Sequence, residues 1–268
     1  MGIMTELRSG YAAVNGLNLY YEIHGAGRPL IVLHGGLGST AMFREILPAL
    51  TGNRQVVAVD LQAHGRTADI DRPLSYQLMA DDMAALIAHL GLDKADFMGY
   101  SLGGAVALRA AIQHPQTVGK LVLISVPLRR NGWYPEVLAA MAQIGPASAE
   151  MMKPSPIYAE YARVAPRPDD FPQLLAKMGT LLRQDYDWSS DLSALKAPPL
   201  LVFGDNDAVR PAHIVEFFQL LGGGQKDAGW DRSGMSAARL AILPGVTHYD
   251  ILSSPVLPAA VVPFLDAK

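Results

Sequence analysis

A serine enclosed by glycines is the residue whose surroundings most clearly suggest chemistry. Ser101 is the centre of the run GYSLG at residues 99–103, which follows an apolar segment and precedes one rich in Ala, Val and Leu. This order is typical of a strand, a sharp turn and a helix. Such a turn strains the serine backbone and directs the N–H groups at the start of the helix toward the hydroxyl, where they stabilise an oxyanion. We expect Ser101 to be a nucleophile, with a helix N-cap as the alternative interpretation.

Two other polar residues also follow apolar segments. Asp207 closes the run GDND after one predicted strand, and His248 closes LPGVTH after the last predicted strand. The C-terminal ends of parallel strands lie along one edge of a sheet, so we expect both side chains near Ser101. A carboxylate that orients a histidine, and a histidine that takes the serine proton, would complete a nucleophilic centre. Asp205 is the other carboxylate of the run and could instead cap the turn.

A glycine-rich loop is the predicted source of an oxyanion hole. The run HGGLGS at residues 34–39 follows an apolar strand, and its glycines allow backbone N–H groups to turn toward a ligand. We expect one donor at Leu102, directly after the serine, and the second at Gly36, with Leu37 as the next candidate. His34 is expected to anchor this loop through hydrogen bonds. A phosphate site is a weaker interpretation, because the loop lacks the G-x-G-x-x-G spacing and a Walker lysine.

Apolar periodicity places these motifs in an α/β fold. Strand-like and helical segments alternate, and the strands are continuously apolar, which predicts a mostly parallel sheet with helices on both faces. The predicted strands are residues 17–23, 29–33, 55–59, 94–98, 120–126, 199–203 and 239–243, and the predicted helices are residues 40–50, 76–90, 102–113, 211–221 and the segment after Pro255.

The alternation of strands and helices is interrupted over residues 128–191. This segment has short helical patches, many prolines and no strand-like run. It is also enriched in methionines and amphipathic aromatics, which line adaptable apolar pockets. The candidate substrate-binding residues are Trp133, Met141, Met152, Tyr158 and Trp188. A polar, glycine-rich stretch over residues 222–236 is expected to be a flexible surface excursion.

Composition excludes several classes of function. The chain has 268 residues, a formal net charge of −3 and no cysteine. It therefore offers no electrostatic case for nucleic acid or an anionic membrane as a partner, and no thiolate chemistry. No segment reaches the ~18–20 apolar residues of a membrane span. Residues 1–11 do not resemble a signal peptide, and Glu6 stands where a myristoylation motif needs Ser or Thr, so we expect a soluble, cytoplasmic protein. The histidines show no metal-ligand spacing, and neither a metal nor an organic cofactor is expected.

Four motifs, in order and spacing, resemble the α/β-hydrolase superfamily over essentially the full chain. They are HGG at residues 34–36, G-x-S-x-G at 99–103, G-x-x-D-x-x-x-P at 204–211 and P-G-x-x-H at 244–248. The resemblance implies an eight-stranded-type sheet, a core of residues 1–127 and 192–268, and a helical cap at residues 128–191. One departure is Ala63, where relatives usually carry glycine. No catalytic role is expected for the neighbouring His64.

This resemblance also implies a reaction. Ser101 attacks an acyl carbonyl, His248 takes its proton, and Asp207 orients the imidazolium. The implied function is that of a serine esterase for small to medium, fairly apolar carboxylic esters. Lactonases, carbon–carbon bond hydrolases, amidases and perhydrolases share the fold, and some relatives keep the triad but act as receptors for small hydrophobic ligands. Dehalogenases and epoxide hydrolases of this fold use an aspartate nucleophile, so Ser101 argues against both.

Overall fold

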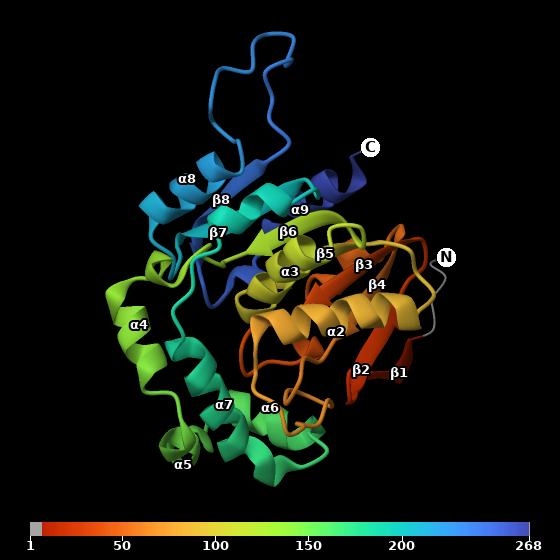
Figure 1. Ribbon diagram of the computed structural model, residues 1–268, viewed down its shortest axis with the longest axis vertical. Helices are drawn as coiled ribbons and strands as arrows, with labels where there is room; N and C mark the ends of the chain where they lie inside the picture. Colours follow the sequence, from red (N-terminus) through yellow and green to blue (C-terminus); the bar gives the residue numbers. More distant parts are fainter. Residues whose placement is uncertain (1–6, 268) are drawn as a thin grey trace.

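The fold is built on one eight-stranded sheet, shown in Figure 1. The structure is a computed structural model that describes residues 7–267. The strand order is β1-β2-β4-β3-β5-β6-β7-β8; β2 is antiparallel to both β1 and β4, and all other neighbours are parallel. The strands are β1 Arg8–Val14, β2 Leu17–His24, β3 Arg28–Leu33, β4 Arg54–Val59, β5 Ala95–Tyr100, β6 Val118–Ile124, β7 Pro199–Asn206 and β8 Arg239–Thr247.

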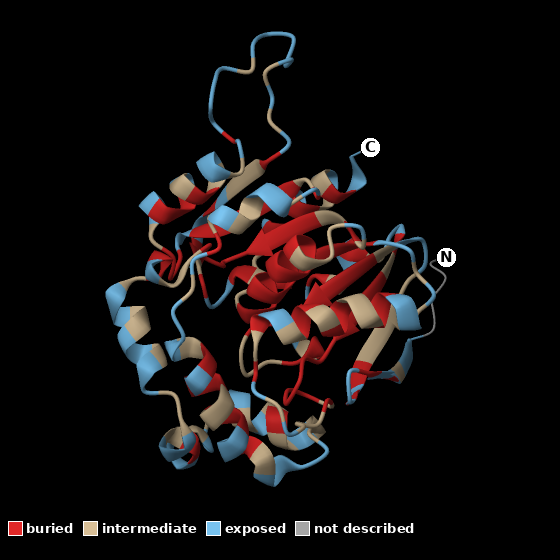
Figure 2. Ribbon diagram, in the orientation of Figure 1, coloured by how far each residue is buried: buried red, intermediate tan, exposed pale blue. Residues whose placement is uncertain are grey.

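Helices cover both faces of the sheet because the strand side chains alternate between two apolar clusters. Ile31 and Leu33 of β3 pack into the cluster that contains α2 and α3, whereas Leu30 and Val32 pack into the cluster that contains α1 and α9. Figure 2 shows that the buried residues concentrate in the sheet and on the helix faces turned toward it. These helices and α8 have the bounds α1 Leu47–Leu50, α2 Tyr76–His89, α3 Leu102–Gln113, α8 Pro211–Leu220 and α9 Leu257–Asp266.

The segment between β6 and β7 forms a helical insertion, which Figure 1 shows gathered at one end of the molecule. Its helices and 3-10 turns are η2 Arg130–Gly132, α4 Pro135–Ala142, η3 Pro146–Ser148, α5 Ala149–Met152, α6 Pro156–Val164, η4 Pro168–Asp170, α7 Phe171–Arg183 and η5 Ser190–Ala194. Lys177 of α7 ties it to the core, since its Nζ lies 2.6 Å from Asp69 and donates to the carbonyl oxygens of Ile70 and Arg72. The prediction that residues 128–191 form a separate cap domain stays a prediction.

Several elements differ from those expected. Strand β1 was not predicted, and β5 continues to Tyr100 instead of ending at Met98. The helix predicted over residues 40–50 is divided into η1, Thr40–Phe43, and α1, because Pro48 fits only the first turn of a helix. Residues 222–238 contain no helix or strand and project from the end opposite the insertion (Figure 1). Residues 1–6, where a targeting signal was considered, lie outside the described residues.

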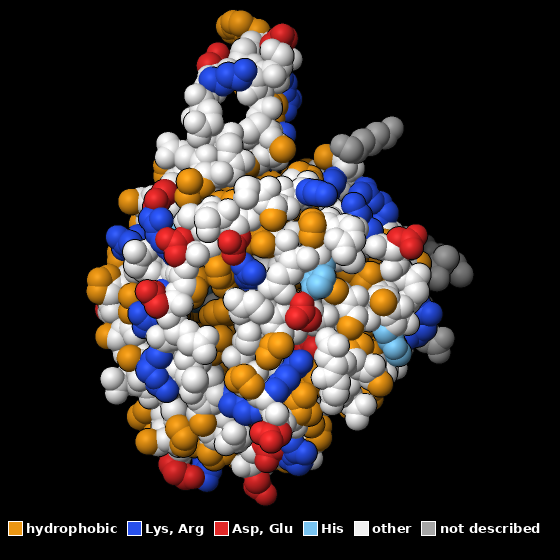
Figure 3. Space-filling view, viewed as in Figure 1, with side chains coloured by type: hydrophobic (Ala, Val, Ile, Leu, Met, Phe, Trp, Pro, Cys, Tyr) orange, Lys and Arg blue, Asp and Glu red, His pale blue; other side chains and the backbone are white. Residues whose placement is uncertain are grey.

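The surface carries charges of both signs. Figure 3 shows Lys and Arg side chains interspersed with Asp and Glu over the face in view, and many of them form ion pairs. None of the helices in the described part of the chain combines the length and apolar character needed to cross a membrane.

His213 of α8 fastens the beginning of the insertion to the core. Its imidazole is buried, and its Nε2 accepts a hydrogen bond of 3.0 Å from the backbone N–H of Leu128. Burial, with a smaller contribution from the positive charge of Arg129, lowers the pKa of His213 from 6.5 to about 4. The ring is therefore neutral in the folded protein at neutral pH, as an Nε2 acceptor requires.

Replacing His213 by Gln should make stability less dependent on pH. The pKa of His213 is lower in the folded than in the unfolded chain, so its favourable contribution is complete above about pH 6.5 and is lost as pH falls toward 4. We expect the loss in free energy of unfolding between pH 7 and pH 5 to be about 1–2 kcal/mol smaller in His213→Gln than in the wild type. Urea unfolding at both pH values measures this. The exposed His89→Gln serves as the control and should leave the loss unchanged; equal losses in the wild type and His213→Gln would contradict the argument.

Candidate active site

Ser101 occupies the turn between β5 and α3 in a strained backbone conformation. Its φ is 52° and its ψ is −113°, it is the N-cap residue of α3, and its N–H donates to the carbonyl oxygen of Ile124 at 2.9 Å. Serine rarely adopts a positive φ, and this cost persists only where surrounding structure enforces it. The hydroxyl makes no hydrogen bond to any described residue and is free to rotate toward a reacting group.

Two glycines allow the turn to form. A Cβ at Gly99 would lie 2.2 Å from the carbonyl oxygen of Gly103, and a Cβ at Gly103 would lie 2.2 Å from the carbonyl oxygen of Leu33. Both contacts are with backbone atoms, which cannot rotate away as a side chain can. Helix α3 therefore begins directly against β3 and β5, and its first turn faces the edge where these strands end.

The N–H groups expected to form an oxyanion hole lie at this edge without acceptors. In the part of the chain that the structure describes, the N–H groups of Gly36, Leu37 and Leu102 donate to no protein atom. The N–H of Leu102 belongs to the first turn of α3, whose N–H groups have no partner within the helix. Leu37 has a φ of 60°, a strained value for leucine.

His34 holds the glycine-rich loop, as expected. Its Nδ1 lies 2.7 Å from the carbonyl oxygen of Gly35, and its Nε2 accepts the N–H of Leu61 at 3.0 Å. Burial is the main cause that lowers the pKa of His34 to about 3, with a further contribution from neighbouring His64. The ring is neutral, so it connects the loop after β3 to the loop after β4 and holds no proton for exchange.

The loop after β4 carries the departure at Ala63. The φ of Ala63 is 65°, a value that glycine adopts without strain. His64 is buried beside His34, with ring centroids 5.2 Å apart, and its Nδ1 lies 2.8 Å from the carbonyl oxygen of Gln62. Burial lowers its pKa to about 4, which fits packing of a neutral ring.

Asp207 and His248 meet at the ends of β7 and β8. His248 Nδ1 lies 3.2 Å from Asp207 Oδ1, and both side chains are almost fully buried. The carboxylate accepts three other hydrogen bonds, from the N–H groups of Val209 and Gly204 and from the hydroxyl of Ser125 at 2.5 Å. Burying a carboxylate is costly unless hydrogen-bond donors surround it, and Asp207 has four.

Asp205, the other carboxylate of the GDND run, is exposed and makes no hydrogen bond to His248 in the described structure. Its Oδ1 accepts the N–H groups of Gly245 at 2.9 Å and Val246 at 3.3 Å. It therefore joins the end of β7 to the last residues of β8, just before His248, which fits the turn-stabilising alternative considered for this residue.

Aromatic rings surround His248. Tyr100, the residue before Ser101, donates its hydroxyl to the carbonyl oxygen of His248 at 2.8 Å, and the two rings lie 5.2 Å apart. Trp133 lies on another side, 5.4 Å from the imidazole in an edge-to-face arrangement. Because Tyr100 connects directly to Ser101 through the chain, this hydrogen bond brings the His248 loop next to the turn after β5.

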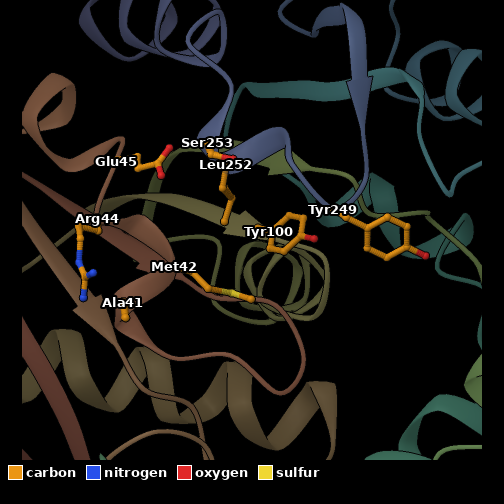
Figure 4. A pocket seen from close by; sticks show the side chains of 8 residues that line it. All are labelled: Ala41, Met42, Arg44, Glu45, Tyr100, Tyr249, Leu252 and Ser253. Carbon is orange, nitrogen blue, oxygen red and sulfur yellow. The ribbon is translucent and has the colours of Figure 1, made fainter. Parts of the chain in front are cut away.

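A cavity of about 250 Å³ lies beside Tyr100 at the rim of this edge. Figure 4 shows Met42 of η1, Tyr100 at the end of β5 and Leu252 of η6 (Ile251–Ser253) pointing toward one another across it. The other lining residues are Ala41, Arg44, Glu45, Tyr249 and Ser253.

The structure separates the candidate pocket residues of the insertion into two groups. Trp133 contacts His248, whereas Trp188 is stacked on Tyr186 at 4.5 Å and packs in an aromatic cluster. Tyr158 packs on Phe171, 5.0 Å between ring centroids. Met141 and Met152 are partly buried against the core.

Sequence reasoning did not select Met178, Ser125 or Tyr100. Met178 of α7 is buried, and its Cε lies so close to Gly36 that a Cβ there would be 2.9 Å away. Met178 therefore covers the glycine-rich loop at Gly36. Its apolar spacing in the helix was readable, but its contact with Gly36 depends on how the insertion folds back.

Three comparisons with known proteins agree on the fold. A family model described as alpha/beta hydrolase fold matches residues 28–153. A relative from Azorhizobium caulinodans named "Putative carbamate hydrolase RutD" is 28% identical over 76% of this chain and 83% of its own length. The chain is similar to proteins of the α/β-hydrolase superfamily and has their fold. Several other curated relatives match over less than half of their own length.

Solved structures show the same fold along almost the whole chain. The structure of E-2-(acetamidomethylene)succinate hydrolase superposes with a TM-score of 0.77 over 98% of this chain and 100% of the other, at 22% identity. The carboxylesterase CesB of Bacillus subtilis gives 0.70 over 98% of this chain and 93% of the other, at 21% identity. The predicted fold class is thereby confirmed.

Substituting Gly103 by Ala should destabilise the protein strongly. The added Cβ meets the backbone of Leu33 and His34 at 2.2–2.6 Å, so the start of α3 must move. We expect a loss of about 3 kcal/mol in the free energy of unfolding. Gly52→Ala, where nothing lies within 4 Å of the added Cβ, should change it by less than about 0.5 kcal/mol. Urea unfolding compares the two variants, and similar midpoints for both would contradict the proposed close approach.

Proposed function

We propose that this protein hydrolyses carboxylic esters of small to medium, fairly apolar substrates through an acyl-enzyme on Ser101. The observation that carries the proposal is the buried pair of Asp207 and His248 at the sheet edge where Ser101 is held with a positive φ. A strained serine, a histidine and an acid hydrogen-bonded to that histidine are the groups that nucleophilic acyl transfer requires.

In the proposed mechanism, the hydroxyl of Ser101 attacks the ester carbonyl as its proton passes to Nε2 of His248. Asp207 holds Nδ1 of the same ring and stabilises the imidazolium that forms. The imidazolium then protonates the alcohol oxygen as the ester bond breaks, which leaves an acyl group on Ser101. Water, deprotonated by His248, attacks this acyl group and releases the acid, and the proton returns to Ser101.

The negative charge that develops on the carbonyl oxygen is assigned to backbone donors. The N–H groups of Leu102 and Gly36, with Leu37 as the next candidate, have no acceptor in the described chain and are available for this oxygen. Preorganised donors of this kind contribute roughly 3–4 kcal/mol each to the transition state.

The preference for apolar substrates is inferred from the insertion. Met178 covers Gly36 and Trp133 packs on His248. Apolar side chains therefore lie beside both the proposed oxyanion donor and the proposed base. Trp133 is retained as a candidate substrate contact. Met141, Met152, Tyr158 and Trp188 are assigned to the packing that supports this wall, as their neighbours indicate.

Carbamate hydrolysis is the second candidate. It is favoured by the relative from Azorhizobium caulinodans, whose name states that activity. A carbamate also presents an acyl carbonyl, so the same nucleophile, base and oxyanion donors would act on it. The two functions differ in the leaving group and in the acyl group that the insertion must accommodate.

Ser101→Ala should abolish turnover without unfolding the protein. The variant loses the nucleophile and gains no new contact, so we expect hydrolysis of p-nitrophenyl butyrate to fall by at least about 1,000-fold. Circular dichroism and the thermal midpoint should match the wild type. Ser193→Ala, an exposed serine in η5, is the matched control and should retain full activity. Substantial ester hydrolysis by a folded Ser101→Ala protein would remove the basis of this function.

Met178→Ala should shift the acyl-chain preference toward longer esters. The substitution removes the side chain that covers Gly36 and leaves space above the proposed oxyanion hole. We expect the ratio of kcat/KM for p-nitrophenyl hexanoate over acetate to rise about tenfold, with a stability loss of about 2–5 kcal/mol for the buried volume. Met151→Ala, which alters an exposed methionine, should change neither quantity. An unchanged ratio in Met178→Ala would place the acyl group elsewhere.

A substrate panel separates the remaining alternatives. Esters, an N-substituted carbamate, a lactone, an anilide and a vinylogous diketone report on the esterase, carbamate hydrolase, lactonase, amidase and carbon–carbon hydrolase functions. We expect the highest kcat/KM for the esters. Release of one equivalent of product followed by tight retention of the ligand would favour the receptor function instead.

A further inference from the structure

Ser125 directly follows β6 and lies in contact with the acid at the end of β7. Its side chain is fully buried, and its N–H donates to the carbonyl oxygen of Val202 at 2.9 Å, which continues the pairing of the two strands by one residue. Its hydroxyl donates to Asp207 Oδ2 at 2.5 Å. This is within the range of short hydrogen bonds from a hydroxyl to a carboxylate.

The two oxygens of Asp207 have separate partners. Oδ1 accepts from His248 Nδ1 and from the N–H of Val209, each at 3.2 Å. Oδ2 accepts from the hydroxyl of Ser125 and, at 3.2 Å, from the N–H of Gly204. The donors on Oδ2 prevent the carboxylate from turning, so Oδ1 is left directed at His248. Ser125 supplies the shortest of these four bonds, and besides His248 itself it is the only side-chain donor among them.

The backbone of Ser125 is strained. Its φ is 52°, which costs an L residue conformational energy that glycine does not incur. In the described part of the chain, Leu37, Ser101 and Ser125 all combine a positive φ with a place at the C-terminal edge of the sheet. The hydrogen bond of the Ser125 side chain to Asp207 is a contact that glycine, the residue best suited to this conformation, could not make.

We infer that Ser125 is a positioning residue for the proposed reaction: its hydroxyl fixes Asp207, and through Asp207 it fixes the orientation of His248. This inference rests on the function proposed above. Two properties of Ser125 can be tested separately, because the strain arises from its backbone conformation and the positioning arises from its hydroxyl. Stability should therefore follow the backbone, and turnover should follow the hydroxyl.

Ser125→Gly and Ser125→Ala test this separation. Both lose the hydroxyl, but only glycine relieves the positive φ. We expect kcat for p-nitrophenyl butyrate to fall about 10- to 100-fold in both variants, as for loss of a hydrogen bond to a charged group. KM should stay within about threefold of the wild type, because the hydroxyl contacts Asp207 and not the substrate pocket. The thermal midpoint of Ser125→Gly should exceed that of Ser125→Ala by a few degrees.

A buried hydroxyl elsewhere provides the control. Thr67 is 1% exposed, and its Oγ1 donates to the carbonyl oxygen of Asp60 at 2.6 Å. Thr67→Val should lower the thermal midpoint and leave kcat within about twofold of the wild type. This is the pattern expected when a lost hydroxyl has only a structural role.

The outcomes are distinguishable. Wild-type kcat in folded Ser125→Gly or Ser125→Ala would overturn the inference, and the hydrolase proposal would stand if Ser101→Ala were inactive in the same assay. Equal losses of kcat in Thr67→Val and Ser125→Ala would also overturn it, because the effect would then follow stability. Turnover by Ser101→Ala would overturn the proposed function and this inference with it.

Discussion

The close approach of three backbone segments at the C-terminal edge of β5 is the constraint on which the candidate site depends. Gly99 touches the first turn of α3, and Gly103 touches the end of β3, with no room for a side chain at either position. The N–H of Gly103 also donates to the carbonyl oxygen of His34 at 3.0 Å. This close packing determines both the strained conformation of Ser101 and the distance between the start of α3 and the glycine-rich loop. It therefore positions the proposed nucleophile and the proposed oxyanion donors of both segments.

Buried histidines and buried carboxylates both lie around this close packing, and burial affects them differently. His34 and His64 are kept neutral by burial, so they hold the loops after β3 and β4 without contributing a charge. Asp207 is buried as well, but four donors surround its oxygens. Asp60 shows the intermediate case: burial raises its pKa to about 6, although the N–H groups of Thr40 and Arg66 donate to it. Burial disfavours the charged form of a group, and hydrogen bonds donated to a carboxylate oppose that effect.

Much of the fold was predictable from the sequence because parallel strands buried on both faces are continuously apolar. The runs at Leu30–Leu33 and Pro199–Phe203 show this directly, and the order of the motifs after them predicted which side chains would share an edge. Strand β1 was not predicted because its run RSGYAAV is rich in small residues and half exposed, so its intrinsic preference for a strand is weak. Its antiparallel pairing with β2 stabilises it instead. The assigned roles of Ser101, Asp207 and His248 stay predictions, although the contact of Asp207 with His248 has the expected form. Ser125 was beyond prediction, since its bond to Asp207 exists only because β6 and β7 are neighbours in a particular register.

The way the insertion leaves the core has a consequence for how such a protein diversifies. Its first residues are held by His213 and by a bridge between Trp133 and Val209, next to Asp207. The helices beyond that anchor, α4 to α7, join no strand of the sheet. Substitutions in these helices can therefore accumulate without changing the strands that carry Ser101, Asp207 and His248. Differences in substrate specificity among homologues should therefore concentrate in this segment. Homologues could then act on different substrates while keeping the same reaction.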